Sequence, residues 1–193
     1  MKFIKKLFNI PIKESKEVQK QEVDLALDDL FVHHFIEKGG KFLYCLKNDE
    51  IAENLKYILQ ENNWQNITLL DSDLSVFLEK EIEVSDNFQP EIPVLTSCEH
   101  LIADNGNILF SSNQLKSVKL SEMPLNFIVY ATTSQLVKDT GQGLTGIKTN
   151  SKKNIPTNIS AVKNYSIKKN DDNFLNYGNN NSKNLYLLLF EDL

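Results

Sequence analysis

Arginine is absent from this sequence: all 21 basic residues among the 193 are lysine. The planar guanidinium group of arginine binds carboxylates and phosphates through two parallel hydrogen bonds, which the compact charge of lysine does not offer. Any site for an anion in this chain must therefore use lysine, backbone amides or the N-terminus of a helix.

Cysteine is also scarce, and Cys45 and Cys98 lie far apart in the sequence. The sequence contains no CxxC motif and no Cys/His quartet, which argues against a zinc or iron–sulfur site. Two isolated cysteines are typical of reduced thiols, so we expect a cytoplasmic protein. No apolar run approaches the roughly 20 residues that a membrane-spanning helix needs.

Positive charge is in deficit, because the formal net charge is −5 and the isoelectric point is near 5.3. Nucleic-acid binding needs a concentrated basic face, so this composition argues against a nucleic-acid partner. With 41% hydrophobic residues, a chain of this length can bury one substantial core. We expect a basic extension over residues 1–20 and a single α/β domain over residues 21–193.

The N-terminal extension mixes apolar residues with lysines. The apolar residues between Phe3 and Phe8 alternate with lysines, which indicates one or two turns of basic amphipathic helix ending before Pro11. Contact with a membrane surface is one interpretation. The segment is so short that a frayed terminus is the favoured one.

The first half of the chain has the pattern of a βαβ unit preceded by a helix. Apolar residues recur at helical spacing from Glu22 until Gly39 and Gly40, which predicts an amphipathic helix over one face of a sheet. The elements expected next are a buried strand over 42–46, a helix over 48–59 capped by Asn48, a strand over 67–70 and a short helix over 74–77. The polar residues 79–93, interrupted twice by proline, predict a linker loop.

The second half predicts further strands and one more helix. Residues 108–110 and 118–120 are expected as strands joined by a hairpin-like link, and 127–130 as a buried strand. Thr132 or Thr133 can cap a helix that ends around Gly141. We expect loop or irregular structure over residues 150–184. The apolar run 185–190 predicts a terminal central strand. The expected fold is three-layer α/β, with a mostly parallel or mixed sheet flanked by helices.

A polar turn at residues 104–107, directly before an apolar stretch, is the main site candidate. Asp, Asn and Gly are common turn residues, so the sequence alone favours an ordinary turn. The alternative is a ligand pocket in which a carboxylate and backbone amides act together with hydroxyls at a following helix start. The residues assigned to this pocket are Asp104, Asn105, Gly106, Asn107, Thr133 and Ser134.

Three further motifs give weaker signals. Residues 141–146 read GQGLTG, a literal GxGxxG, but they follow an expected helix rather than a strand, so a helix-ending loop is favoured over a dinucleotide site. His33 and His34 are adjacent on a helix and point about 100° apart, which disfavours a shared ligand. Cys98 and His100 would diverge as well. We therefore assign no catalytic residue, no metal ligand and no cofactor.

The turn also carries a family resemblance. Residues 102–109, IADNGNIL, resemble the "(I/A)-A-(D/E)-T-G-(S/T)-hydrophobic" signature of the LUD domain, the lactate-utilisation protein C family. Met123-Pro124-Leu125 and the apolar residues after it resemble that family's next block. Two blocks depart from the pattern: residues 155–169 read IPTNISAVKNYSIKK where the family has G-P-S-x-T-A-D-I-E, and 177–181 read YGNNN where it has G-x-H-G-P.

The resemblance implies a fold similar to the NagB/RpiA/CoA-transferase-like group and a role beside the iron–sulfur proteins of lactate oxidation. The first hypothesis is a diverged LUD-domain module that binds a small anionic metabolite or serves organic-acid metabolism without catalysis. The second is an enzyme on a CoA-transferase-like scaffold that acts on a small anionic acyl or phosphorylated substrate. The third is a membrane-surface adaptor that uses residues 1–20.

The cysteine content gives the first testable prediction. Iron–sulfur clusters are usually held by four cysteine thiolates or a Cys/His mixture, and this chain has two distant cysteines. The purified protein should be colourless and contain no stoichiometric iron or zinc by elemental analysis. About one tightly held metal ion per chain, lost on mutation of Cys98 or His100, would contradict this prediction.

Overall fold

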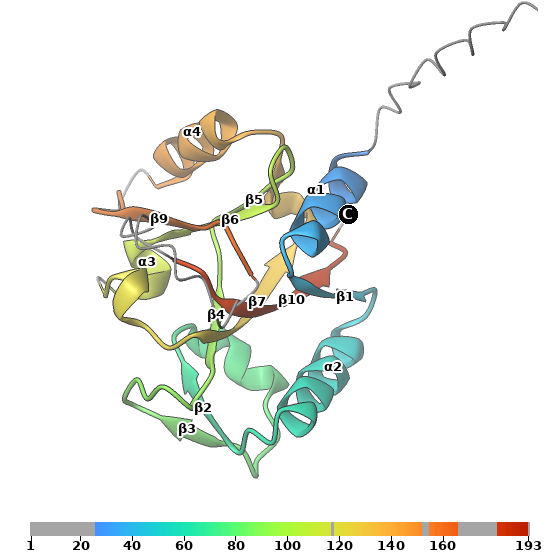
Figure 1. Cartoon of the computed structure of the whole chain (residues 1–193), viewed down its shortest axis with the longest axis vertical. Coiled ribbons are helices and arrows are strands. Elements are labelled where there is room, and N and C mark those ends of the chain that lie inside the picture. The colour runs from blue at the N-terminus through green and yellow to red at the C-terminus, as the bar shows by residue number, and fades with distance from the viewer. Residues whose placement is uncertain (1–25, 117, 152–154, 166–180, 193) are drawn as a thin grey trace, which may run out of the picture.

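The computed structural model describes residues 26–116, 118–151, 155–165 and 181–192 (Figure 1). Its central sheet has six strands in the order β1-β10-β7-β4-β2-β3, and each neighbouring pair among them is parallel. The strands are β1 (Lys41–Cys45), β2 (Asn66–Leu69), β3 (Glu83–Ser85), β4 (Val94–Ser97), β7 (Asn126–Thr132) and β10 (Asn184–Phe190). The expected α/β fold with a mostly parallel sheet is confirmed.

The apolar C-terminal run forms the middle of this sheet. Strand β10 lies between β1 and β7, and five consecutive residues from Leu185 to Leu189 are buried. A strand that is covered on both faces needs apolar side chains at successive positions, which is why LYLLLF fits here. The predicted terminal central strand is confirmed.

One face of the sheet is covered by α2 (Asn48–Glu61) and η1 (Ser72–Phe77). Helix α2 places Ile51, Leu55 and Ile58 against Leu95, Ile128 and Leu188 of the sheet, as the helical spacing predicted. The predicted cap is wrong by one residue: α2 begins at Asn48, and its N-cap is Lys47, which precedes the predicted cap. Glu50 completes the start, because its carboxylate accepts hydrogen bonds from the amides of Leu46 (2.7 Å) and Lys47 (3.3 Å).

The opposite face carries α1 (Leu27–Glu37) and a second, four-stranded sheet in the order β8-β5-β6-β9 (Figure 1). The β5–β6 and β6–β9 pairs are antiparallel, and β5–β8 is parallel. The remaining elements are β5 (His100–Ile102), β6 (Asn107–Ser111), α3 (Ser112–Leu115), η2 (Leu120–Glu122), η3 (Thr133–Gln135), β8 (Leu136–Val137), α4 (Thr140–Asn150) and β9 (Ile159–Val162). The mixed pairing expected of one sheet therefore lies in a separate small sheet.

One strand prediction and one loop prediction are wrong. Residues 118–120 do not pair with β6; α3 follows β6 directly, and β6 pairs with β9. Ser111 caps α3, since its Oγ accepts the Asn113 amide at 3.0 Å, so the link is a helical turn and not a hairpin. Residues 79–93 are more than a linker, because Glu83–Ser85 forms β3 and extends the central sheet beside β2.

The helix predicted from Thr132 or Thr133 to Gly141 is wrong in its length: Thr132 is the N-cap of η3, which ends at Gln135. Strand β7 continues to Thr132, and η3 and β8 follow it; the helix, α4, begins only at Thr140 and contains the GxGxxG segment. Its glycines allow close packing: a Cβ on Gly143 would lie 3.1 Å from Leu109 Cδ1, and one on Gly146 would lie 2.9 Å from His100 Nε2. The segment is therefore helix and not a helix-ending loop.

The structure tests the predictions for residues 150–184 and for the N-terminal segment over only part of their length. Within 150–184, predicted as loop or irregular, the structure has β9, and residues 166–180 lie outside the described part of the chain. The basic extension over 1–20 and the first residues of the predicted N-terminal helix lie outside it as well. Among the described helices, none has the length and apolar character to cross a membrane.

Candidate functional site

The turn at residues 104–107 joins β5 to β6 and is closed by its own backbone. The Gly106 amide donates to the Ile102 carbonyl at 2.8 Å, and the Asn107 amide donates to Asn105 Oδ1 at 3.0 Å. Gly106 has φ +62°, a left-handed conformation that glycine adopts without steric cost. A Cβ at this position would also lie 2.6 Å from the backbone nitrogen of Phe35, so glycine is required twice over.

The turn packs against helix α1. Lys38, which follows the helix, donates from Nζ to the Asn105 carbonyl and to Asn107 Oδ1 at 3.0 Å. Burial, followed by the charge of Lys163, lowers the pKa of Lys38 from its ordinary value. The lysine therefore joins α1 to the turn and uses its donors on protein oxygens.

A buried tyrosine closes the other side of the turn. Tyr165 Oη donates to the Gly106 carbonyl at 2.6 Å, and its ring lies 4.4 Å from that of Phe35 between centroids. Burial raises the pKa of Tyr165 well above its ordinary value, so the phenol stays protonated. Tyr165 lies in the segment 155–169, where the sequence departs from the glycine-containing family block.

Asp104 is the exposed polar group of the turn. Its side chain is exposed, and its amide donates to the Lys138 carbonyl at 3.0 Å. The amides of Asp104, Gly106 and Asn107 thus all donate within the protein. The turn presents a carboxylate to solvent, while the Gly106 and Asn107 amides, which the sequence assigned to a ligand, already donate to protein oxygens.

Thr133 and Ser134 lie elsewhere, where β7 ends, and they bind a carboxylate of the chain itself. Asp192 Oδ1 accepts from Thr133 Oγ1 at 2.8 Å and from the Ser134 amide at 2.9 Å, and Asp192 Oδ2 accepts from Ser134 Oγ at 2.7 Å. Burial opposes ionisation of Asp192, but the hydrogen bonds from Ser134 and Thr133 outweigh it and lower its pKa to about 2. These donors hold an anion without arginine.

The six predicted residues therefore fall into two sets. Residues 104–107 bind Lys38 and Tyr165, whereas Thr133 and Ser134 bind Asp192. Strand β8 connects the two sets, because it follows η3 and pairs with β5 just before the turn.

Further polar residues share the carboxyl edge of the central sheet with Thr133 and Ser134. Ser97, at the end of β4, donates to Asp71 Oδ2 at 2.5 Å, and Asp71 follows β2. Half-buried Tyr130 has a raised pKa, first through burial and then through the charge of Asp192. Ligands of parallel α/β sheets bind outside the carboxyl ends of the strands. Asp71 and Asp192 could have been found in the sequence, since each lies two residues after the end of an apolar strand.

The Cys98–His100 segment does not form a nucleophile pair. Burial raises the pKa of the Cys98 thiol, so the thiol stays protonated. Gln135 Nε2 donates to the Cys98 carbonyl at 2.5 Å, and the imidazole Nδ1 of His100 lies 3.2 Å from the Gln135 carbonyl. Glu99 accepts from Ser111 Oγ at 2.5 Å. These contacts hold the β5–β6 hairpin to η3.

The argument against a shared ligand for His33 and His34 is corrected by the structure. Their ring nitrogens and a carboxylate oxygen of Glu37 all lie within 4.8 Å of one another, because Glu37 is one turn further along α1 and reaches both rings. All three side chains lie on one helix; those of His33 and Glu37 are exposed and that of His34 is half-buried, which gives any metal little enclosure.

Comparisons with known proteins bear on these residues. A family model described as LUD domain matches residues 78–190, a stretch that includes the turn, β7, η3 and β10. A crystal structure of a DUF162 family protein from Deinococcus radiodurans superposes with a TM-score of 0.60 at 12% sequence identity, over 86% of this chain and 99% of that chain. At this identity the likeness concerns the fold. No curated protein matches the chain.

The first prediction from this geometry concerns Gly106. Gly106→Ala should lower the free energy of unfolding by about 2 kcal/mol or more, because a left-handed alanine costs about 1–2 kcal/mol and its Cβ would overlap the α1 backbone. Urea unfolding measures this. The control, Gly141→Ala at the start of α4, should change stability by less than about 1 kcal/mol. Equal losses in both variants would contradict the packing argument.

The second prediction concerns Asp192. Its pKa falls from an ordinary 3.8 to about 2 in the folded chain. The ionised carboxylate therefore stabilises the fold above about pH 4, and this contribution is lost as the pH falls towards 2. Asp192→Asn should unfold at lower urea than the parent protein at pH 6, and the difference should shrink at pH 2.5.

Asp86→Asn, in the exposed loop after β3, is the matched control for Asp192→Asn and should show no such pH-dependent difference. A difference for Asp192→Asn that stays constant from pH 6 to pH 2.5 would show that its carboxylate is not held by Thr133 and Ser134.

Proposed function

Because the chain belongs to the LUD domain family, which is associated with lactate utilisation, we propose that it binds a small carboxylate of organic-acid metabolism at the carboxyl edge of its central sheet. The observation that carries this proposal is the binding of Asp192 by Thr133 and Ser134. Two hydroxyls and one amide converge there on a carboxylate, so the donor set suits a carboxylate ligand that replaces or joins Asp192.

The exposed carboxylate of Asp104 is a second candidate contact for the ligand, separate from Thr133 and Ser134. A carboxylate accepts hydrogen bonds only, so Asp104 would bind a hydroxyl of the ligand and not its anionic group. A 2-hydroxy acid such as lactate carries both groups. Since the turn and the end of β7 have separate hydrogen-bond networks, the experiment must test each of them.

We propose binding without catalysis. The titratable groups around the turn are used structurally: Lys38 binds turn oxygens, Tyr165 is held protonated by burial, and so is Cys98. Iron–sulfur proteins of lactate oxidation are proposed as partners through the family relationship alone, and a redox centre would belong to them. The enzyme hypothesis and the membrane-adaptor hypothesis gain no specific support from the described residues.

Thermal unfolding with L-lactate tests the proposal. A ligand at 100 times its dissociation constant adds about 2.7 kcal/mol of stability, which raises the melting temperature of a chain of this size by roughly 5–10 °C. Ser134→Ala removes one donor to the anion, and Asp104→Asn removes the acceptor for the hydroxyl. Each variant should reduce or abolish the lactate-induced shift, and Asp104→Asn should leave the melting temperature without ligand nearly unchanged.

The control for Ser134→Ala is Ser75→Ala, an exposed serine of η1 away from both residue sets, which should keep the full shift. Loss of the shift in only one of the two test variants would assign the ligand to that residue set. An absence of any shift with L-lactate or inorganic phosphate at millimolar concentration would overturn the proposal.

A further inference from the structure

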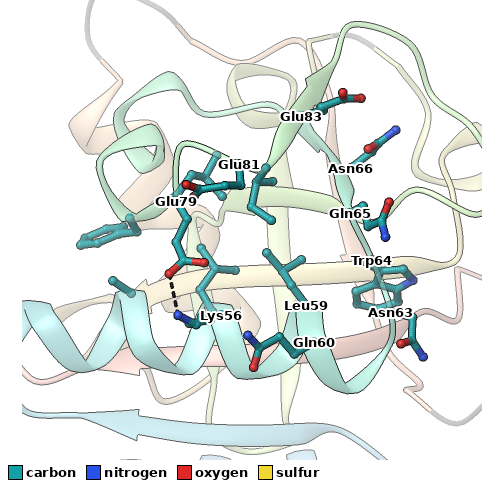
Figure 2. A pocket seen from close by; sticks show the side chains of 15 residues that line it. Lys56, Leu59, Gln60, Asn63, Trp64, Gln65, Asn66, Glu79, Glu81 and Glu83 are labelled. Carbon is teal, nitrogen blue, oxygen red and sulfur yellow. Dashed lines mark hydrogen bonds and ion pairs between the residues drawn. The ribbon is translucent and has the colours of Figure 1, made fainter.

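A pocket of about 510 Å³ lies between α2 and the segment from Phe77 to Glu83, on the face of the sheet opposite α1 (Figure 2). This volume is in the range of small-molecule sites. The pocket reaches Asn66, the first residue of β2, so it opens towards the amino ends of the strands. Asp71, Ser97 and Asp192 lie at the other ends, so this is a second site.

The floor of the pocket is apolar. Leu55 and Leu59 of α2 are buried, and Ile82 from the opposite wall is half-buried. Trp64, which follows α2, is also half-buried and is held edge-on against the ring of Tyr186 at 6.2 Å between centroids. Figure 2 shows Leu59 pointing from the helix into the space between the walls. An aromatic or alkyl body could therefore be covered here.

The rim of the pocket is acidic. Glu79, Glu81 and Glu83 are exposed along one wall, while Lys56 of α2 supplies the positive charge among the lining residues. Lys56 Nζ lies 2.8 Å from Glu79 Oε1, and this ion pair closes one end (Figure 2). One lysine against three glutamates leaves two negative charges. The pocket therefore favours a cation and disfavours an anion.

A smaller hollow adjoins the pocket at Trp64. That hollow, of about 420 Å³, shares Trp64 and Asn66 with the pocket and adds Glu91 and Ile92. Trp64 therefore stands between two spaces that both carry acidic residues. The indole ring can attract a cation over its face, and the neighbouring carboxylates strengthen this preference.

We propose that the pocket between α2 and residues 77–83 binds a small organic cation, an amine or quaternary ammonium compound with an aromatic or alkyl body. The apolar floor covers the body, and Glu81 and Glu83 attract the charged group. This chemistry is opposite to that of the carboxyl edge, which holds a carboxylate. Binding at the two sites can therefore be measured separately.

Fluorescence of Trp64 reports directly on this pocket, because it is the sole tryptophan of the chain. The probes are 4-phenylbutylamine and 4-phenylbutyrate, which share one body and carry opposite charges. Titration at low salt should give a saturable change of Trp64 emission with the amine and about tenfold weaker binding of the carboxylate. Calorimetry provides the same affinities without relying on the indole.

Charge variants test whether the glutamates of the rim attract the amine. Glu81→Gln combined with Glu83→Gln should weaken amine binding about five- to tenfold and remove the preference for the amine. The matched control is Glu53→Gln combined with Glu61→Gln, which removes two exposed charges from α2 outside the pocket and should leave the preference in place.

Three results would overturn the proposal. They are equal binding of the two probes, an equal loss of amine affinity in the test and control variants, and an absence of both a fluorescence change and heat at millimolar amine.

Discussion

The packing of Phe35 between two glycines is the contact on which the layer above the central sheet depends. A Cβ at Gly40 would lie 2.4 Å from the Phe35 ring, and one at Gly106 would lie 2.6 Å from its backbone nitrogen. The ring also contacts Phe31 and Tyr165, with centroids 5.5 and 4.4 Å away. Glycine at both positions lets α1 approach the β5–β6 turn closely enough for Lys38 and Tyr165 to reach its oxygens. The polar turn is thus fixed by an apolar contact beneath it.

The turn that resembles the family signature is held by a segment that departs from the family pattern. In this chain the segment 155–165 forms β9 and then contains Tyr165, whose hydroxyl donates a hydrogen bond to the Gly106 carbonyl. The turn therefore keeps its conformation while several of its polar groups bind protein atoms. Asp104 remains available because its side chain points to solvent.

The sequence predicted those parts of the fold that depend on local pattern. The strands near 67–70, 127–130 and 185–190 are apolar runs, and their burial is what such runs indicate. The strand predicted at 42–46 forms as β1, but its predicted burial is wrong: β1 lies at the edge of the central sheet, and Cys45 is its one buried residue. The chain gave no local signal for α4. Its glycines lower helix propensity, and the helix is stabilised by packing on Leu109 and Ile102, which are distant in sequence. Strand β3 has three residues with no buried side chain, so periodicity could not identify it.

In the candidate site, too, the sequence predicted what depends on local pattern and missed what depends on distant residues. A turn at 104–107 follows from its residue types, but the lysine that binds it lies 67 residues earlier than Asn105, and no local pattern connects the two. Likewise Thr133 and Ser134 were found as helix-start hydroxyls, while their acceptor Asp192 is 58 residues from Ser134. Sequence reasoning identified the turn and the two hydroxyls, and it missed Lys38 and Asp192, which bind them.

The chain has no arginine, and several of its lysines bind groups of the protein itself. Lys38 binds oxygens of the turn, and buried Lys183 donates to the carbonyls of Met123 and Pro124 at 2.9 Å each. Burial lowers the pKa of Lys183 to about 8, and Lys56 is paired with Glu79. Lysines placed in this way stabilise loops and helix contacts more than they offer charge to a ligand. The carboxylate of Asp192 is accordingly held by hydroxyls and an amide, and an anionic metabolite at that edge would have to rely on the same neutral donors.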